Sequence, residues 1–114
     1  MSEGDKVDCA SLTVKKVVAI NNRQPGPGGP KGSYVIVTVD APNPGVSASL
    51  GKTVPQGFNP NILFLDIEAT QADGLHPEVI TETEARIDLD AYYEEVVVHC
   101  NGEAVGGAKF QDVS

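Results

Sequence analysis

The chain has 114 residues, the length of one domain, and 40% of them are hydrophobic, which excludes an intrinsically disordered protein. Its formal net charge is −8, and residues 66–114 hold twelve acids against two bases, so the chain lacks the basic surface that nucleic acid binding requires. No apolar run has the length of a membrane span or of a signal peptide. We therefore expect a single domain over residues 1–114, made in the cytoplasm without a signal peptide, with neither a membrane nor a nucleic acid as partner.

Short apolar runs separated by turn residues predict strands throughout the chain. Twelve glycines and eight prolines cluster between runs that are rich in β-branched residues. A polar N-terminal arm, residues 1–10, leads to a first strand at Leu12–Ile20 that kinks near its two lysines. One face of this strand is expected to carry Leu12, Val14, Val18 and Ile20.

A Gly/Pro-rich loop is expected between the first two strands, over residues 21–32. Three prolines and four glycines in this segment oppose regular structure. Long loops in small domains often carry function. Arg23, Gln24 and Lys31 therefore form a candidate interaction loop, and a passive connection is the alternative.

The middle of the chain predicts three strands. Ser33–Asp40 is apolar on both faces and should be central in its sheet. Val46–Leu50 is short and should lie at a sheet edge. In Asn61–Thr70, alternation directs four side chains to the core: Leu63, Leu65, Ile67 and Ala69.

The clearest alternation in the sequence predicts a fifth strand at Val79–Leu89. Its inner face should carry Val79, Thr81, Thr83, Ala85, Ile87 and Leu89. Its outer side forms a candidate acidic face made of Glu82, Glu84, Asp88 and Asp90. A solvated surface that aids solubility is the alternative to a face that meets a basic partner.

The end of the chain predicts a hairpin. Glu95–Cys100 should be the sixth strand, and Asn101-Gly102 is a strong signal for a two-residue turn. Glu103–Val113 should return as the seventh strand, with a bulge at Gly106-Gly107. About seven short strands without a helix predict an all-β fold, an antiparallel Ig-like β-sandwich, with a partly open barrel as the alternative.

Two segments carry a family resemblance: Val37–Leu50 (VTVDAPNPGVSASL) and Lys52–Thr70 (KTVPQGFNPNILFLDIEAT). Through them, residues 12–70 resemble bacterial and phage Ig-like β-sandwich domains, which occur in surface proteins and phage structural proteins. Ala91-Tyr92-Tyr93 also resembles the tyrosine corner of such folds, and a tyrosine that only packs is the alternative. The resemblance implies a scaffold for adhesion, decoration or recognition, and no catalytic residues.

No catalytic, cofactor-binding or metal-binding residues are predicted. His99 and Cys100 are adjacent, so in a strand they point to opposite faces and do not readily share a zinc ion. The late carboxylates do not match the spacing of a twelve-residue calcium loop. We therefore expect a protein that is not an enzyme and has no cofactor.

Cys9 and Cys100 leave two possibilities open. A reducing cytoplasm favours free thiols. However, Cys9 precedes the first strand and Cys100 ends the sixth, and strictly alternating strand directions place both at the same end of a sandwich. A disulfide between them is therefore possible but not required.

The leading functional hypothesis is a non-enzymatic structural or binding module, such as a phage virion decoration or capsid-associated protein. Its partners would be another protein or further copies of itself. The acidic second half also suits an intracellular inhibitor that mimics nucleic acid and binds a basic protein. An adhesion or carbohydrate-binding module is the third possibility.

Overall fold

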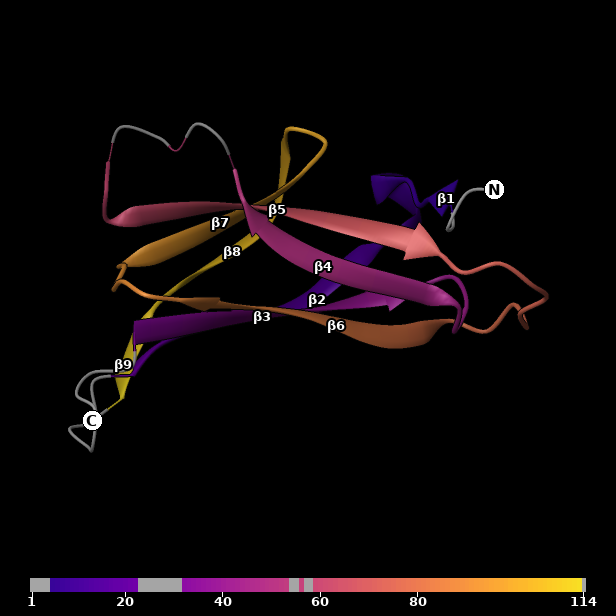
Figure 1. Cartoon of the computed structure of the whole chain (residues 1–114), viewed down its shortest axis with the longest axis horizontal. Coiled ribbons are helices and arrows are strands. Elements are labelled where there is room, and N and C mark those ends of the chain that lie inside the picture. The colour runs from indigo at the N-terminus through magenta and orange to yellow at the C-terminus, as the bar shows by residue number, and fades with distance from the viewer. Residues whose placement is uncertain (1–4, 23–31, 54–55, 57–58, 114) are drawn as a thin grey trace.

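The structure is a computed structural model that describes residues 5–22, 32–53, 56 and 59–113. These residues form an all-β fold, and Figure 1 shows its strands in two layers. The elements are β1 (Asp5–Lys6), a short 3₁₀ turn (Cys9–Ser11), β2 (Thr13–Asn22), β3 (Gly32–Ala41), β4 (Val46–Lys52), β5 (Ile62–Gln71), β6 (Thr81–Leu89), β7 (Glu95–Cys100), β8 (Glu103–Lys109) and β9 (Gln111–Val113). No helix in this described part is long and apolar enough to cross a membrane.

Two sheets face each other. In the five-stranded sheet, β5 pairs with β4 on one side and with β7 and β1 on the other, and β8 pairs with β7. The four-stranded sheet has the order β6-β3-β2-β9. The predicted positions of β3 in the centre of a sheet and of β4 at an edge are confirmed for the described residues.

The expectation of antiparallel pairing throughout is wrong, because β5 pairs with β7 and β2 pairs with β9 in parallel. From β2 to β8, successive strands do alternate in direction along the chain (Figure 1). However, β6 joins the other sheet, so β5 and β7, which run the same way, become neighbours. The predicted seventh strand is interrupted at Phe110, and its last part crosses over to β2 as β9.

The core lies between the sheets and is built from alternate residues. The largest fully buried side chains are Val35, Val37, Val39, Leu63, Leu65, Val96 and Val98. Each stabilises the fold by roughly 1.5–3 kcal/mol through removal of apolar surface from water. The predicted inward face of β5 is confirmed, because its four apolar residues are all buried.

A β-bulge in β2 inverts the expected facing of that strand. Val14 pairs with Val39 and Lys16 pairs with Thr38, so Lys15 is an inserted residue. Val17 therefore packs on the core and Ala19 is buried, with 3% of its surface exposed. The predicted face is wrong beyond the bulge, because one inserted residue exchanges the two sides of a strand.

Other boundaries differ by a few residues. β6 begins at Thr81, so Val79 lies outside the strand and is 58% exposed, contrary to the predicted inner face. Ile87 is half-buried against the core, whereas Ala85 and Leu89 are buried. The N-terminal arm contributes β1, which the sequence did not predict. Arg23, Gln24 and Lys31 lie outside the described residues.

The hairpin between β7 and β8 turns at Asn101 and Gly102, whose φ values are 53° and 85°. Both residues thus take the left-handed conformation that a tight turn of this type requires. The register shifts after Val98, which leaves Val105 as the extra residue beside Gly106. A side-chain carbon on Gly106 would lie 3.2 Å from Val14 Cγ1, so glycine allows β8 to approach β2 closely.

Cys9 and Cys100 form a disulfide, with their Cα atoms 6.0 Å apart. The two residues are separated by 91 positions in the sequence. The bridge ties the segment before β2, in one sheet, to the end of β7, in the other. A cross-link over so long a loop stabilises a fold mainly by restricting the unfolded chain.

Removal of this disulfide should lower the free energy of unfolding by about 4.6 kcal/mol, the value that the chain-entropy model gives for a loop of this length. Urea denaturation with and without a reductant measures the change. The Cys9→Ser/Cys100→Ser variant is the control, since a reductant should not affect it. Unchanged stability of the wild type under reduction, or two alkylated thiols in the non-reduced protein, would argue against the bridge.

Ala19→Asp should destabilise the protein by at least about 3 kcal/mol, because it places an unpaired charge in the core. Val18→Asp, one position earlier, should cost about 1 kcal/mol or less, because Val18 faces outward. Chemical denaturation of both variants provides the comparison. A larger effect of Val18→Asp would mean that the bulge is absent.

Candidate functional site

The described residues contain no group of three or more His, Cys, Asp or Glu side chains that could hold a metal ion. The ring of His99 stacks on Phe64 with the centroids 5.6 Å apart. His99 thus packs against an aromatic ring. The other features of interest are surfaces and a pocket.

The outer surface of the four-stranded sheet combines an apolar strip with charges of both signs. We call this surface the β3 face, after its central strand. It consists of Lys15, Lys16, Val18, Ile20, Tyr34, Ile36, Thr38, Asp40, Glu82, Glu84, Arg86 and Asp88. Figure 1 shows the second layer of strands on the opposite side of this sheet.

The strand register arranges the β3 face in rows that run across three strands. Lys16, Thr38 and Glu84 form one row. The next row holds Val18, Ile36 and Arg86, and the following one holds Ile20, Tyr34 and Asp88. Bases thus lie at the start of β2, three acids and Arg86 lie along β6, and the apolar side chains lie on β2 and β3.

The apolar strip of the β3 face consists of Val18, Ile20, Tyr34 and Ile36, all of which are half-buried. The three aliphatic residues are absent from both clusters that form the core, although hydrophobic neighbours in β2 such as Val17 belong to them. Val18 and Ile20 also line a hollow together with Ala108, Lys109 and Gln111 at the β8–β9 side of the sheet. Because contiguous apolar surface often marks a contact site, this strip is a candidate for one.

Arg86 covers one end of the strip. Its guanidinium carbon lies 4.5 Å from the centre of the Tyr34 ring, and Nη2 donates to Asp88 Oδ1 at 2.9 Å. The cation is therefore shared between an aromatic face and a carboxylate. This arrangement holds the Arg86 side chain flat against the sheet.

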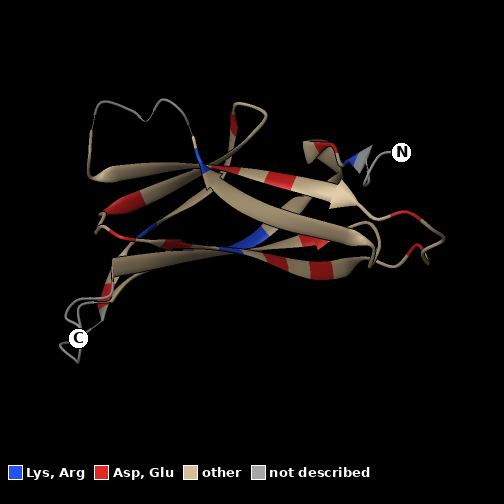
Figure 2. Cartoon of the chain, viewed as in Figure 1, with Lys and Arg blue, Asp and Glu red and all other residues tan. Residues whose placement is uncertain are grey.

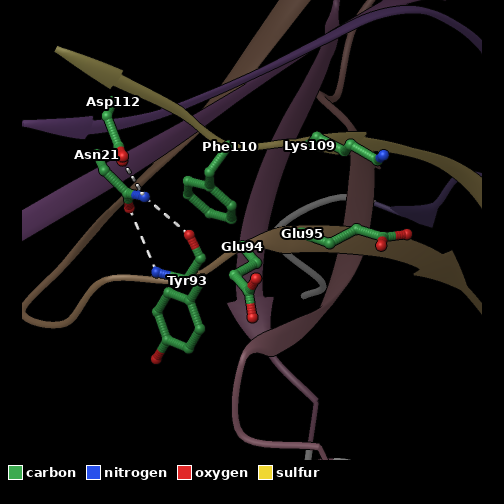
Figure 3. Close-up of a pocket in the computed structure, with 7 residues that line it drawn as sticks. All are labelled: Asn21, Tyr93, Glu94, Glu95, Lys109, Phe110 and Asp112. Atoms are coloured by element: carbon green, nitrogen blue, oxygen red, sulfur yellow. Dashed lines mark hydrogen bonds between the residues drawn. The ribbon is translucent and has the colours of Figure 1, made fainter.

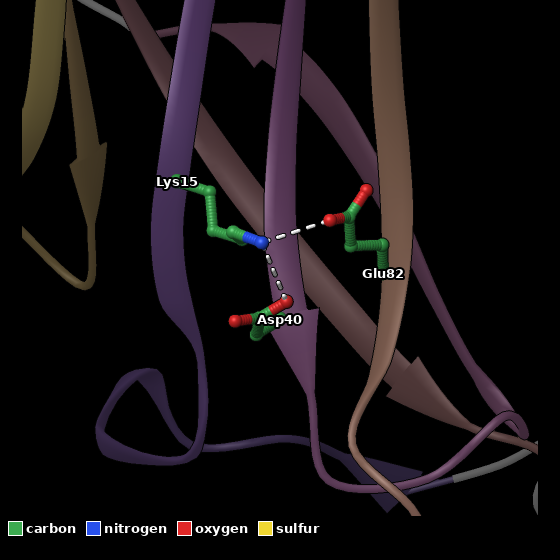
Figure 4. Close-up of polar contacts among 3 residues, drawn as sticks. All are labelled: Lys15, Asp40 and Glu82. Carbon is green, nitrogen blue, oxygen red and sulfur yellow. Dashed lines mark hydrogen bonds and ion pairs between the residues drawn. The ribbon is translucent and has the colours of Figure 1, made fainter.

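Lys15 bridges the surface of the sheet from β2 to β6 (Figure 4). Its Nζ donates to Glu82 Oε2 at 2.8 Å and lies 3.9 Å from Asp40 Oδ1. The hydrogen bond from Lys15 and its charge hold the pKa of Glu82 below the ordinary value for Glu. The hydrogen bond to Glu82, followed by the charge of Asp40, raises the pKa of Lys15.

The residues of the predicted acidic face are all exposed. Glu82, Glu84 and Asp88 lie on β6, and Asp90 follows the end of that strand. Figure 2 shows the acidic residues repeating along β6. However, Glu82 pairs with Lys15 and Asp88 pairs with Arg86, so the surface carries both signs of charge.

A pocket of about 470 Å³ lies where the β6–β7 connection meets β2 and β9 (Figure 3). Asn21, which is buried, organises it: Nδ2 donates to Tyr93 O at 2.8 Å and to Asp112 Oδ1 at 2.9 Å. Asn21 Oδ1 accepts from Tyr93 N at 3.3 Å. These hydrogen bonds connect β2 to the β6–β7 connection and to β9. They occupy the amide group of Asn21, which therefore offers no free polar group to a ligand in the pocket.

The sequence placed Asn21 in the long loop and therefore missed this role. The available signal was a polar residue at the end of an apolar strand together with the Tyr92-Tyr93 pair. The Tyr92 hydroxyl donates to Asn22 O at 3.1 Å. This bond spans 70 residues, so it links distant segments, whereas a tyrosine corner bonds to the backbone a few residues upstream.

The most exposed apolar side chains lie in the connection between β5 and β6. Leu75, Val79 and Ile80 are the large exposed hydrophobic residues among those described. Figure 1 places this connection at the opposite end of the sandwich from β9. Unlike the β3 face, it lies outside the regular strands.

Comparison of the chain with protein-family models, curated proteins and solved structures gave no significant match. The functional interpretation therefore depends on the surfaces themselves. Of these, the β3 face combines apolar side chains and ion pairs on three hydrogen-bonded strands.

Lys15→Met should raise the pKa of Glu82 towards its ordinary value, because the variant loses the hydrogen bond and the charge that lower it. Side-chain carboxyl shifts followed by NMR during a pH titration measure this change. Lys16→Met is the matched control, since it removes the neighbouring charge but not the hydrogen bond. An equal rise in both variants would show that the contact between Lys15 and Glu82 is not the cause.

Proposed function

We propose that the protein is a non-enzymatic structural module that works through protein–protein contact, including contact between its own copies, and that the β3 face is the contact surface. The observation that supports this most strongly is the half-buried strip of Val18, Ile20, Tyr34 and Ile36 on the outer side of a sheet. Covering apolar surface of this kind removes it from water, which favours association against the loss of freedom that binding costs.

A virion decoration or capsid-associated component is the specific form of this function that we favour. The Ig-like resemblance of residues 12–70 supports it, and the two-layer all-β structure is compatible with that resemblance, although its parallel pairings depart from an antiparallel pattern. The disulfide between Cys9 and Cys100 also supports a role outside a reducing compartment.

The two other functions receive less support. An inhibitor that mimics nucleic acid needs a surface of one sign, whereas Lys15 and Arg86 compensate two of the four candidate acids. A carbohydrate-binding module needs an aromatic ring open to a sugar, whereas Arg86 covers Tyr34 on the β3 face.

Self-association is the simplest measurable consequence of the proposed function. Sedimentation velocity of the wild type should show a mass that rises with concentration between about 1 μM and about 1 mM, the range of weak to moderate affinities. Ile36→Glu should remain monomeric over that range, because it places a charge in the centre of the apolar strip.

Ser47→Glu is the matched control, because Ser47 is exposed on β4 in the other sheet. It adds the same charge and should leave the association unchanged. Urea denaturation of both variants should show folded proteins of similar stability. A wild type that is monomeric at every concentration, or equal loss of association in both variants, would contradict the proposal.

A further inference from the structure

We infer that the β3 face binds a second copy of this chain across a two-fold axis parallel to β3, so that Lys16 of each copy faces Glu84 of the other. This inference rests on the proposed function, because it requires the β3 face to be the contact surface. It adds the partner, the orientation and the residues that select that orientation.

The separation of charges across the β3 face is the basis of this inference. Lys16 on β2 and Glu84 on β6 both pair with Thr38 on β3, from opposite sides. Neighbouring strands lie about 4.8 Å apart, so the two charged residues are separated by about 10 Å at the backbone. Among the described residues, neither has an ion-pair partner within 4.0 Å.

The neighbouring lysine does not compete for this role. Lys15 already contacts Glu82 and Asp40 in its own chain. The bulge therefore places Lys15 and Lys16 next to each other on one surface, where they make different contacts. Lys15 connects the strands of the sheet, and Lys16 remains available to a partner.

Symmetry then limits how two copies of the β3 face can meet. Two sheets that pack face to face as identical partners have a two-fold axis in the plane of the interface. An axis perpendicular to the strands would place β6 over β6, so that two strands with three outward acids and one base, Arg86, would face each other. An axis parallel to β3 exchanges β2 with β6 and places Lys16 opposite the Glu84 of the other copy.

The parallel axis also keeps each row opposite its own counterpart, so the dimer has two equivalent pairs of Lys16 and Glu84. Thr38, Ile36 and Tyr34 lie near the axis and meet the same residues of the other copy. Because β-sheets twist, two sheets packed face to face diverge towards their corners, and the Thr38 row, which is near the middle of β3, stays among the closest.

In the row next to Thr38, Asp40 meets Asp40 of the other copy near the axis, and Lys15 Nζ, which lies 3.9 Å from Asp40 Oδ1 in its own chain, offsets this repulsion. The rows of Val18 and Ile20 are compatible with the same arrangement. Val18 meets Arg86, whose aliphatic stem covers apolar surface while its charge stays with Asp88. Ile20 meets Asp88, a carboxylate already paired with Arg86 in its own chain. The row of Lys16 and Glu84 is therefore the one that sets the orientation.

A charge exchange tests this pairing. Lys16→Glu and Glu84→Lys should each weaken self-association about tenfold, because each opposes like charges twice in the dimer. The Lys16→Glu/Glu84→Lys double variant should recover the wild-type affinity. An equimolar mixture of the two single variants should also form a dimer of wild-type affinity, because both pairs are then complementary.

Lys52→Glu is the control for net charge, because Lys52 is exposed on β4 in the other sheet. It changes the charge of the chain as much as Lys16→Glu does and should leave the affinity nearly unchanged. Sedimentation equilibrium measures all variants, and urea denaturation verifies that each is folded.

The outcomes separate the two proposals. Recovery in the double variant and in the mixture supports the two-fold arrangement. If the wild type associates but the double variant does not recover, or if Lys52→Glu weakens the dimer as much as Lys16→Glu, the arrangement is wrong while the proposed function stands. A wild type that never associates overturns both.

Discussion

One inserted residue in β2 determines the character of two surfaces at once. The bulge at Lys15 turns Val17 and Ala19 towards the core and Val18 and Ile20 towards the outer side of the sheet. Without it, the alternation set by Val14 would bury Val18 and Ile20. The apolar strip on the outer surface, from which the proposed function is argued, depends on this local irregularity.

The same bulge brings Lys15 and Lys16 to one surface, where a regular strand would separate them. Lys15 on β2 reaches across β3 to Glu82, and this ion pair connects β2 with β6. Such exposed ion pairs contribute little to the stability of the fold. Their main effect is to fix the positions of the charged side chains on the surface. The sheet therefore presents two lysines at the start of β2, an apolar strip on β2 and β3, and acids together with Arg86 on β6.

Much of the fold follows from period-two alternation, since the predicted bounds of β7 agree with the structure and those of β3 differ by one residue at each end. Alternation cannot reveal an inserted residue, because Val17 and Val18 suit either face. It also cannot tell which sheet a strand joins, so the parallel partnership of β5 and β7 was not predictable from their local patterns. The acidic residues of β6 were recognisable as a group, whereas their basic partners on β2 required the register.

Contacts between β2 and β8 provide the most direct test of the bulge. A side-chain carbon on Gly106 would lie 3.2 Å from Val14 Cγ1 and 3.4 Å from Val17 Cγ2, so both valines face β8 across the sandwich. We predict nuclear Overhauser effects from the Gly106 α-protons to the methyl groups of Val14 and Val17, and none to those of Val18. Effects from Gly106 to Val18, with none to Val17, would contradict the inverted strand and remove the basis of the β3 face.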